Sequence, residues 1–278
     1  MGVLRFLWSR AWQAHAALLP LLHMGDPCCP ENTCVNLQVV WNKALAGNCG
    51  LTDDALARAM LPASSRWLIG RPLCWLYPRF HHALIAERTR YIDAAIADAA
   101  LQPSDCVVSL GAGFDTRALR YSGSWVEIDL PDVAGQKRCI SERLLRNSPS
   151  LAGRAPRLVA ADLASADGLD ALRDALCASG AARVVVIVEA LLIYLPHDAC
   201  RALLRECATG ASLVIFADQL PAVPYGADDE AEQAVSLLAD CGLELVPHSW
   251  RTKRGFARHM GVARPSKKCD LTHLDACI

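Results

Sequence analysis

The sequence lacks the features that mark several classes of protein. It has no apolar run long enough to span a bilayer, and its formal net charge of −1 leaves no concentrated basic face. We therefore expect neither a membrane span nor a nucleic-acid partner. The 278 residues, 53% of them hydrophobic and 21% charged, suit one large globular domain with a helical addition.

Cysteines at metal-binding spacing are also missing. The 13 cysteines are scattered singly apart from Cys28, Cys29 and Cys34, and no C-x-x-C unit or His/Cys spacing indicates zinc. Scattered, unpaired cysteines are typical of reduced thiols that pack like small apolar residues. We expect no metal site and a reducing compartment, the cytoplasm.

The first 24 residues contain no acidic side chain. They carry Arg5 and Arg10 among apolar residues near helical spacing. This pattern is found in organelle-targeting leaders and also in N-terminal helices packed on a core; the packed helix is favoured here, and the leader stays open.

The rest of the chain predicts an α/β fold. Residues 1–100 form a helical segment, whereas residues 101–265 alternate short apolar runs with amphipathic stretches, as βα units around a parallel sheet do. Val184–Val188 is entirely β-branched, as a central strand buried on both faces requires. Strands are expected at Cys106–Leu110, Trp125–Asp129, Arg157–Ala161, Arg183–Glu189 and Ala211–Ala217.

The end of the chain predicts a different arrangement. The amphipathic stretch Glu230–Cys241 is followed by strands at Leu243–Trp250 and Phe256–Ala263, joined by a hairpin-length connection at Arg251–Gly255. Residues 266–278 form a tail. The expected architecture is a Rossmann-like, mostly parallel seven-stranded sheet that ends in an antiparallel hairpin, with the N-terminal helical addition.

A glycine turn follows the first strand. Gly111 and Gly113 let a ligand approach the backbone, and the N–H groups that follow face the ligand. The third glycine of the dinucleotide-binding fingerprint is replaced by Thr116, which argues against a bound pyrophosphate.

Acidic residues end the next three strands. Asp129, 18 residues after Gly111, can accept hydrogen bonds from both hydroxyls of a ribose, or else cap the helix that begins at Pro131. Asp162 beside Leu163 suits an adenine, although a surface loop acid fits the spacing as well. Glu189 lies where open α/β sheets bind ligands, or caps the next helix.

Two arginines lie close together in a predicted helix, Ala83–Ala100. Arg88 shares its helix face with Leu84 and Ile92, so its guanidinium needs an anion such as a cofactor carboxylate, an internal ion pair, or a route to solvent. Arg90 falls on the polar face.

Four sequence blocks together resemble the leucine carboxyl methyltransferase family of S-adenosylmethionine-dependent enzymes. The order of elements, five βα-type strands followed by a helix and a hairpin, is also that of a class I methyltransferase. The blocks are Arg88-Thr89-Arg90-Tyr91-Ile92-Asp93, Leu110-Gly111-Ala112-Gly113-Phe114-Asp115-Thr116-Arg117, Glu127-Ile128-Asp129-Leu130-Pro131 and Glu189-Ala190-Leu191-Leu192-Ile193-Tyr194-Leu195.

The resemblance implies S-adenosylmethionine as cofactor and a role for each matching residue. Arg88 would hold the cofactor carboxylate, and Gly111, with Gly113, would contact its amino-acid portion. Asp129 would bind the ribose. Asp162 and Leu163 would bind the adenine, and Glu189 would lie near the methionine end.

The acceptor is less well defined by the sequence. The resemblance implies O-methylation of a carboxylate, in a protein C-terminus or a small acid. Tyr194 and Arg90 are the candidates for orienting the acceptor. A carboxylate needs no general base, whereas a hydroxyl acceptor would make His197 the first base to test. The helical insertion typical of the family after the fifth strand is replaced by Gln219–Asp228. This shortened segment favours a catalytically silent, partner-binding relative as one alternative. An NAD-dependent oxidoreductase, which shares the glycine turn and Asp129, is the other.

Overall fold

The structure, a computed structural model, describes residues 34–69, 79–177, 180–253 and 259–266. The chain divides into two compact units. The N-terminal unit contains the described residues up to Arg90, together with Gly113–Arg120 and Gly135–Ala155. The sheet unit contains Tyr91–Ala112, Tyr121–Ala134 and the described residues from Pro156 onward.

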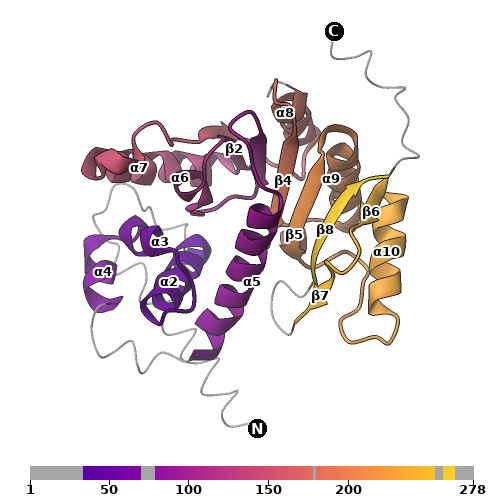
Figure 1. Ribbon diagram of the computed structural model, residues 1–278, viewed down its shortest axis with the longest axis horizontal. Coiled ribbons are helices and arrows are strands. Elements are labelled where there is room, and N and C mark those ends of the chain that lie inside the picture. Colours follow the sequence, from indigo (N-terminus) through magenta and orange to yellow (C-terminus); the bar gives the residue numbers. More distant parts are fainter. Residues whose placement is uncertain (1–33, 70–78, 178–179, 254–258, 267–278) are drawn as a thin grey trace. The chain divides into compact units, whose positions relative to one another are not determined.

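The sheet unit is built on eight strands in the order β3-β2-β1-β4-β5-β8-β6, with β7 paired to β8 (Figure 1). The neighbouring pairs among β1 to β5 are all parallel. Their bounds are Cys106–Leu110 for β1, Ser124–Asp129 for β2, Arg157–Ala160 for β3, Val184–Glu189 for β4 and Leu213–Asp218 for β5. The predicted Rossmann-like α/β fold is therefore confirmed, with the five parallel strands within two residues of their expected bounds.

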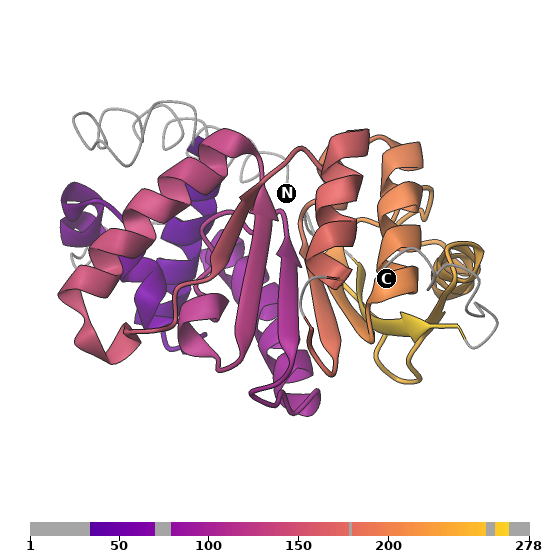
Figure 2. The ribbon, with the colours of Figure 1, turned by 90° about the horizontal axis from the view of Figure 1, so that it is seen from above.

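Three helices cover one face of this sheet. They are α8 (Ala166–Cys177), α9 (His197–Gly210) and α10 (Glu230–Asp240), and their buried side chains form one apolar cluster with every second residue of β1, β2, β4 and β5. Figure 2 shows α8 and α9 side by side on this face, with the Tyr91–Asp98 half of α5 on the other. The alternation follows from the strand pleat, and Val184–Val188 is buried on both faces as predicted.

The C-terminal strands differ in part from the prediction. Instead of one strand from 243 to 250, β6 covers Leu243–Leu245 and the two-residue β7 covers Arg251–Thr252. Both pair antiparallel with β8 (His259–Pro265). The interruption includes His248, whose φ of 63° is incompatible with an extended strand. The expected hairpin tip therefore begins with a strand, and the sheet has eight strands where seven were expected.

The N-terminal unit is helical. Its helices are α2 (Cys34–Asn48), α3 (Ala55–Met60), α4 (Ala63–Ile69), the first half of α5 (Arg79–Asp98), α6 (Arg117–Arg120) and most of α7 (Pro131–Asn147). The 3-10 turn η3 (Pro149–Leu151) also lies in this unit, whereas the 3-10 turn η4 (Leu192–Tyr194) lies in the sheet unit. The division at residue 100 that the sequence suggested stays a prediction, and the 24-residue N-terminal segment lies outside the described residues.

The cysteines bear on the expected redox state. Cys106, Cys200, Cys207 and Cys241 are buried free thiols, as expected of small apolar packing residues. Cys139 is disulfide-bonded, so the expectation of reduced thiols is wrong at that position. No helix in the described part of the chain is long and apolar enough to cross a membrane.

Candidate functional site

The carboxyl ends of four adjacent parallel strands carry the residues that the sequence singled out in the sheet unit. Gly111 follows β1, Asp129 ends β2, Asp162 and Leu163 follow β3, and Glu189 ends β4. Because β3, β2, β1 and β4 are neighbours in this order, these residues share one edge of the sheet. This is the edge at which open α/β sheets bind ligands.

Gly111 is required by its backbone and by its surroundings. Its φ is +59°, and a Cβ placed there would lie 2.9 Å from Cδ1 of Leu191. Its N–H donates to the carbonyl of Ile128 at 2.8 Å, which fixes the turn against β2. The turn therefore presents bare backbone at the strand edge, as close approach of a ligand requires.

The two aspartates are accessible. Asp129 is half-buried, and its Oδ1 accepts a hydrogen bond from the N–H of Leu130 at 2.8 Å. Asp162 is exposed and accepts from the N–H of Ala164 at 2.9 Å, while Leu163 is buried. Each carboxylate is thus oriented by the backbone that follows it, and Leu163 supplies an apolar contact beside Asp162.

Glu189 is followed by a turn that a buried carboxylate organises. Asp218, at the end of β5, is fully buried and accepts hydrogen bonds from the N–H groups of Leu191, Leu192 and Ile193 at 2.5, 2.8 and 3.2 Å. It also accepts from the N–H of Gln219 at 2.7 Å. Burial raises the pKa of Asp218 to about 6, against these four hydrogen bonds, which lower it.

Asp218 is a residue that sequence reasoning missed. The fifth strand was expected to end at Ala217, one residue short of Asp218, and no role was assigned to this carboxylate, which β5 in fact includes. The same position at a strand end that drew attention to Asp129 and Glu189 could have identified it.

The two arginines of α5, both in the N-terminal unit, differ in exposure as the helical pattern predicted. Arg88 is buried, with 7% of its surface exposed, whereas Arg90 is exposed. Gly113, in the same unit, has a φ of +47°, and a Cβ there would lie 3.0 Å from Oδ1 of Asn36 on α2. The pattern therefore assigned the faces of α5 correctly, while the ligand roles of these residues stay predictions.

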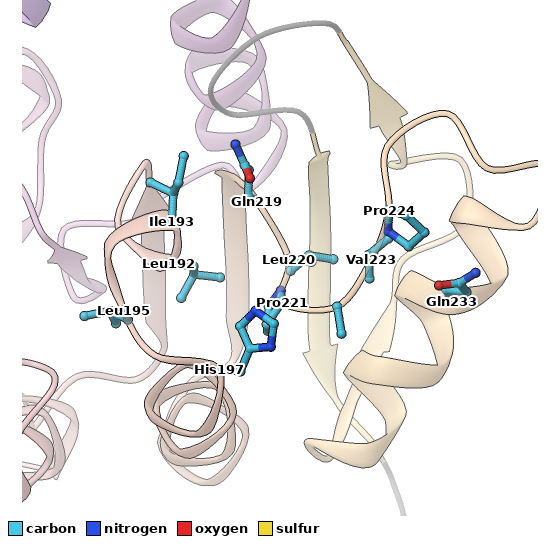
Figure 3. A pocket seen from close by; sticks show the side chains of 11 residues that line it. Leu192, Ile193, Leu195, His197, Gln219, Leu220, Pro221, Val223, Pro224 and Gln233 are labelled. Carbon is cyan, nitrogen blue, oxygen red and sulfur yellow. The ribbon is translucent and has the colours of Figure 1, made fainter.

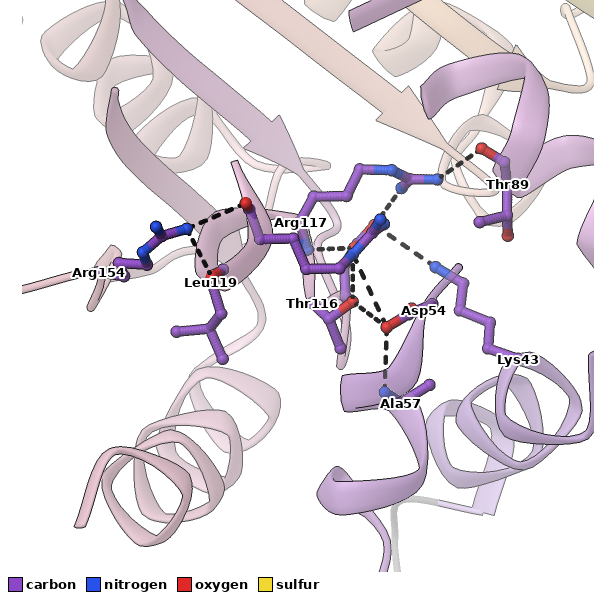
Figure 4. Close-up of polar contacts among 10 residues, drawn as sticks. Lys43, Asp54, Ala57, Thr89, Thr116, Arg117, Leu119 and Arg154 are labelled. Carbon is purple, nitrogen blue, oxygen red and sulfur yellow. Dashed lines mark hydrogen bonds and ion pairs between the residues drawn. The ribbon is translucent and has the colours of Figure 1, made fainter. Parts of the chain in front are cut away.

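The buried residues Asp115, Thr116 and Arg117 form the polar interior of the N-terminal unit. Figure 4 shows Thr116 and Arg117 with their partners Asp54 and Thr89. Asp115 pairs with Arg117 and lies 3.5 Å from Nζ of Lys43 on α2. Burial alone would raise the pKa of Asp115, but Arg117, Lys43 and Lys137 outweigh it and hold that pKa well below its usual range. The carboxylate is therefore ionised and ties α2 to the segment Gly113–Arg120 of the same unit.

Thr116 and Arg117 extend this interior to two more helices. The Thr116 hydroxyl donates to Oδ1 of Asp54 at 2.7 Å, and Asp54 caps α3 by accepting from the N–H of Ala57. The Arg117 guanidinium donates to the carbonyl of Thr89 on α5. Thr116, noted in the sequence for replacing a glycine, thus contributes to packing, and nothing in its pattern indicated Asp54 as partner.

The predicted acceptor residue Tyr194 lies beside a pocket. It is 60% exposed in η4, and the preceding Leu192 and Ile193 line a cavity of about 440 Å³. His197 and the segment from Gln219 to Pro224 also line this cavity (Figure 3). The short segment after β5, expected from the sequence to be a reduced cover, is therefore one wall of a pocket.

Comparisons with known proteins identify one family. The family model described as leucine carboxyl methyltransferase matches residues 34–208. A search of curated proteins finds no match.

A search of solved structures finds methyltransferases among the similar chains. The magnesium protoporphyrin IX methyltransferase from Synechocystis PCC 6803 is 15% identical, with 65% of this chain and 80% of that chain covered and a TM-score of 0.46. An O-methyltransferase family protein from Burkholderia thailandensis is 15% identical, with 68% and 61% covered and a TM-score of 0.40. An S-adenosylmethionine-dependent methyltransferase from Clostridium acetobutylicum is 10% identical, with 64% and 90% covered and a TM-score of 0.40.

Proposed function

Because the chain belongs to the leucine carboxyl methyltransferase family, we propose that it transfers a methyl group from S-adenosylmethionine to a carboxylate oxygen of a small acid or a protein C-terminus. The observation that carries the proposal is the set Gly111, Asp129, Asp162 and Glu189 at the ends of four adjacent parallel strands.

The residues at this edge fit the cofactor. Gly111 leaves the space that a Cβ would fill, so the amino-acid portion can approach the backbone. The half-buried Asp129 can accept hydrogen bonds from two ribose hydroxyls. Asp162 offers a carboxylate to the adenine amino group, and the buried Leu163 offers an apolar surface to the ring.

The chain's own residues mainly have to align the reactants. The cofactor supplies a methyl group on a positively charged sulfur, and displacement from it needs the acceptor oxygen in line. Arg88 binds the cofactor carboxylate in this proposal, and Glu189 lies near its methionine end. Arg90 and Tyr194, both exposed, orient the acceptor.

No general base is required for a carboxylate. With an ordinary pKa near ~4 it is already ionised at neutral pH, so no side chain has to remove a proton. A hydroxyl acceptor is the second candidate. It is favoured by one observation, namely that the His197 imidazole lines the pocket after β4 and could accept the hydroxyl proton.

The test is methyl transfer from labelled S-adenosylmethionine to small carboxylic acids and to peptides with free C-termini, followed by mild alkali. A methyl ester releases volatile labelled methanol under these conditions, whereas a methyl ether does not. Base-labile label supports the proposal, and alkali-stable label indicates the hydroxyl candidate. Tight S-adenosylhomocysteine binding without transfer to any acceptor would indicate the silent, partner-binding relative.

A further inference from the structure

The pocket of about 440 Å³ lies at the carboxyl ends of β4 and β5, within the sheet unit (Figure 3). Leu192, Ile193 and Leu195 form one wall, and Gln219–Pro224 form the other. The pocket is therefore on the same strand edge as Gly111, Asp129 and Glu189.

The turn after β4 connects the pocket to that edge. Leu191 packs against Gly111, since its Cδ1 lies 2.9 Å from where a Cβ would be. Leu192 and Ile193, the next two residues, line the pocket. One short turn thus borders the proposed cofactor site with its first residue and the pocket with the next two.

Buried side chains hold both walls in place. Asp218 fixes the wall that follows β4, because it accepts hydrogen bonds from the N–H groups of residues 191–193. His259 and Glu230 fix the segment that follows β5. The Leu220 N–H donates to Nδ1 of His259 at 3.0 Å, and the Gly226 N–H donates to Oε2 of Glu230 at 2.7 Å. Nε2 of His259 lies 3.1 Å from Oε1 of Glu230, so the two side chains that hold Leu220 and Gly226 are themselves in contact. Because these walls are already fixed, binding a ligand costs little conformational entropy of the protein.

The lining indicates what the pocket can hold. Eight of its eleven residues are Leu, Ile, Pro, Val or Ala, and the others are His197, Gln219 and Gln233, so apolar side chains share the pocket surface with polar groups. None is Asp, Glu, Lys or Arg, and the exposed acids Asp198 and Asp229 stand beside it in sequence, with Asp229 accepting from Nε2 of Gln233 at 2.8 Å. An anionic group inside would have no lysine or arginine among the lining residues to pair with, whereas the apolar side chains can contact a hydrocarbon group.

We propose that this pocket binds the hydrocarbon portion of the methyl acceptor, and that the acceptor is a small aliphatic monocarboxylic acid whose carboxylate stays at the pocket mouth. The acceptor class rests on the proposed function. The pocket then selects acceptors by the length of the apolar chain.

The test measures binding of butanoate, hexanoate, octanoate and decanoate to the protein saturated with S-adenosylhomocysteine, by calorimetry. Affinity is expected to rise about fourfold per methylene, the equivalent of about 0.8 kcal/mol, until the pocket is full. Gln233→Trp fills the pocket from α10 and is expected to weaken octanoate binding at least about tenfold. Val235→Trp, on the exposed side of the same helix, is the matched control and leaves it unchanged.

A second variant works from the opposite wall. Ile193→Ala enlarges the pocket and is expected to move the preferred acid to a longer chain. Affinities that do not depend on chain length, or equal effects of the two Trp variants, would overturn the inference. Absence of methyl transfer from S-adenosylmethionine to acids that do bind would instead count against the proposed function alone.

Discussion

Arg88 and Arg90 are two residues apart on α5 and have opposite exposures. We expect Arg88→Ala to weaken S-adenosylhomocysteine binding by at least about 2 kcal/mol, because the cofactor carboxylate would lose the guanidinium with which it pairs in our proposal. Arg88→Lys recovers part of this loss, since an ammonium does not reproduce the bidentate contact. Arg90→Ala leaves cofactor affinity nearly unchanged. Calorimetric titration measures all three, and equal losses at the two positions would contradict the assignment of Arg88.

The variant Asp129→Ala distinguishes a ribose-binding role of this carboxylate from a helix-capping role. As a ribose ligand, Asp129→Ala weakens cofactor binding by about 1.5–3 kcal/mol, the range for hydrogen bonds to a charged group, and leaves the thermal midpoint unchanged. Capping predicts the reverse, a lower midpoint with the same affinity. Calorimetry and thermal unfolding of the same preparation separate the two roles.

Gly111 tolerates no side chain. Gly111→Ala forces a left-handed conformation on alanine and pushes its Cβ against Leu191, so we expect about 1–3 kcal/mol of lost stability and a weaker cofactor complex. Gly135→Ala is the control, because Gly135 lies within α7 with open space around it, and there alanine raises stability by up to about 1 kcal/mol. Chemical unfolding gives both values. A neutral Gly111→Ala would show that the turn adjusts easily.

The turn after β4 depends on the ionisation of one carboxylate from β5. Because the pKa of Asp218 in the folded protein, about 6, lies above its unfolded value, its contribution to stability is fully present below about pH 4 and is lost as the pH rises through about 6. The stability difference between wild type and Asp218→Asn should therefore shrink by on the order of 2 kcal/mol across this range.

Urea unfolding at acidic and neutral pH measures this difference. His259, the register partner of Asp218 on β8, and the nearby Cys200 thiol are present in both proteins, so the comparison isolates Asp218. A difference that does not change with pH would show that Asp218 ionises as it does in the unfolded chain.

The sequence predicted regular elements better than it predicted the contacts between them. Strands β1 to β5 and the two faces of α5 follow from local periodicity, which the chain displays directly. The break between β6 and β7 depends on a positive φ at His248, a residue type that does not signal it. The pairs Thr116–Asp54 and Asp218–Leu191 join distant positions, so no local pattern could reveal them.

Thermal unfolding of the intact protein shows which cofactor it binds, because a bound ligand stabilises the folded state. S-Adenosylhomocysteine at about 100 times its Kd should raise the unfolding free energy by about 2.7 kcal/mol, whereas NAD should leave the thermal midpoint unchanged. Thermal unfolding with each ligand measures the effect. Saturable stabilisation by NAD with no response to S-adenosylhomocysteine would indicate an oxidoreductase.

The polar interior around Thr116 also constrains biosynthesis. Asp54, which caps α3, leaves the ribosome 62 residues before Thr116, and Met60 leaves it 83 residues before its partner Arg143. At roughly 5–20 residues per second, the nascent α2, α3 and α4 wait several seconds for the partners that complete their packing. We expect their apolar faces to be exposed during that interval, and therefore expect the translation rate between residues 60 and 143 to influence the yield of folded protein.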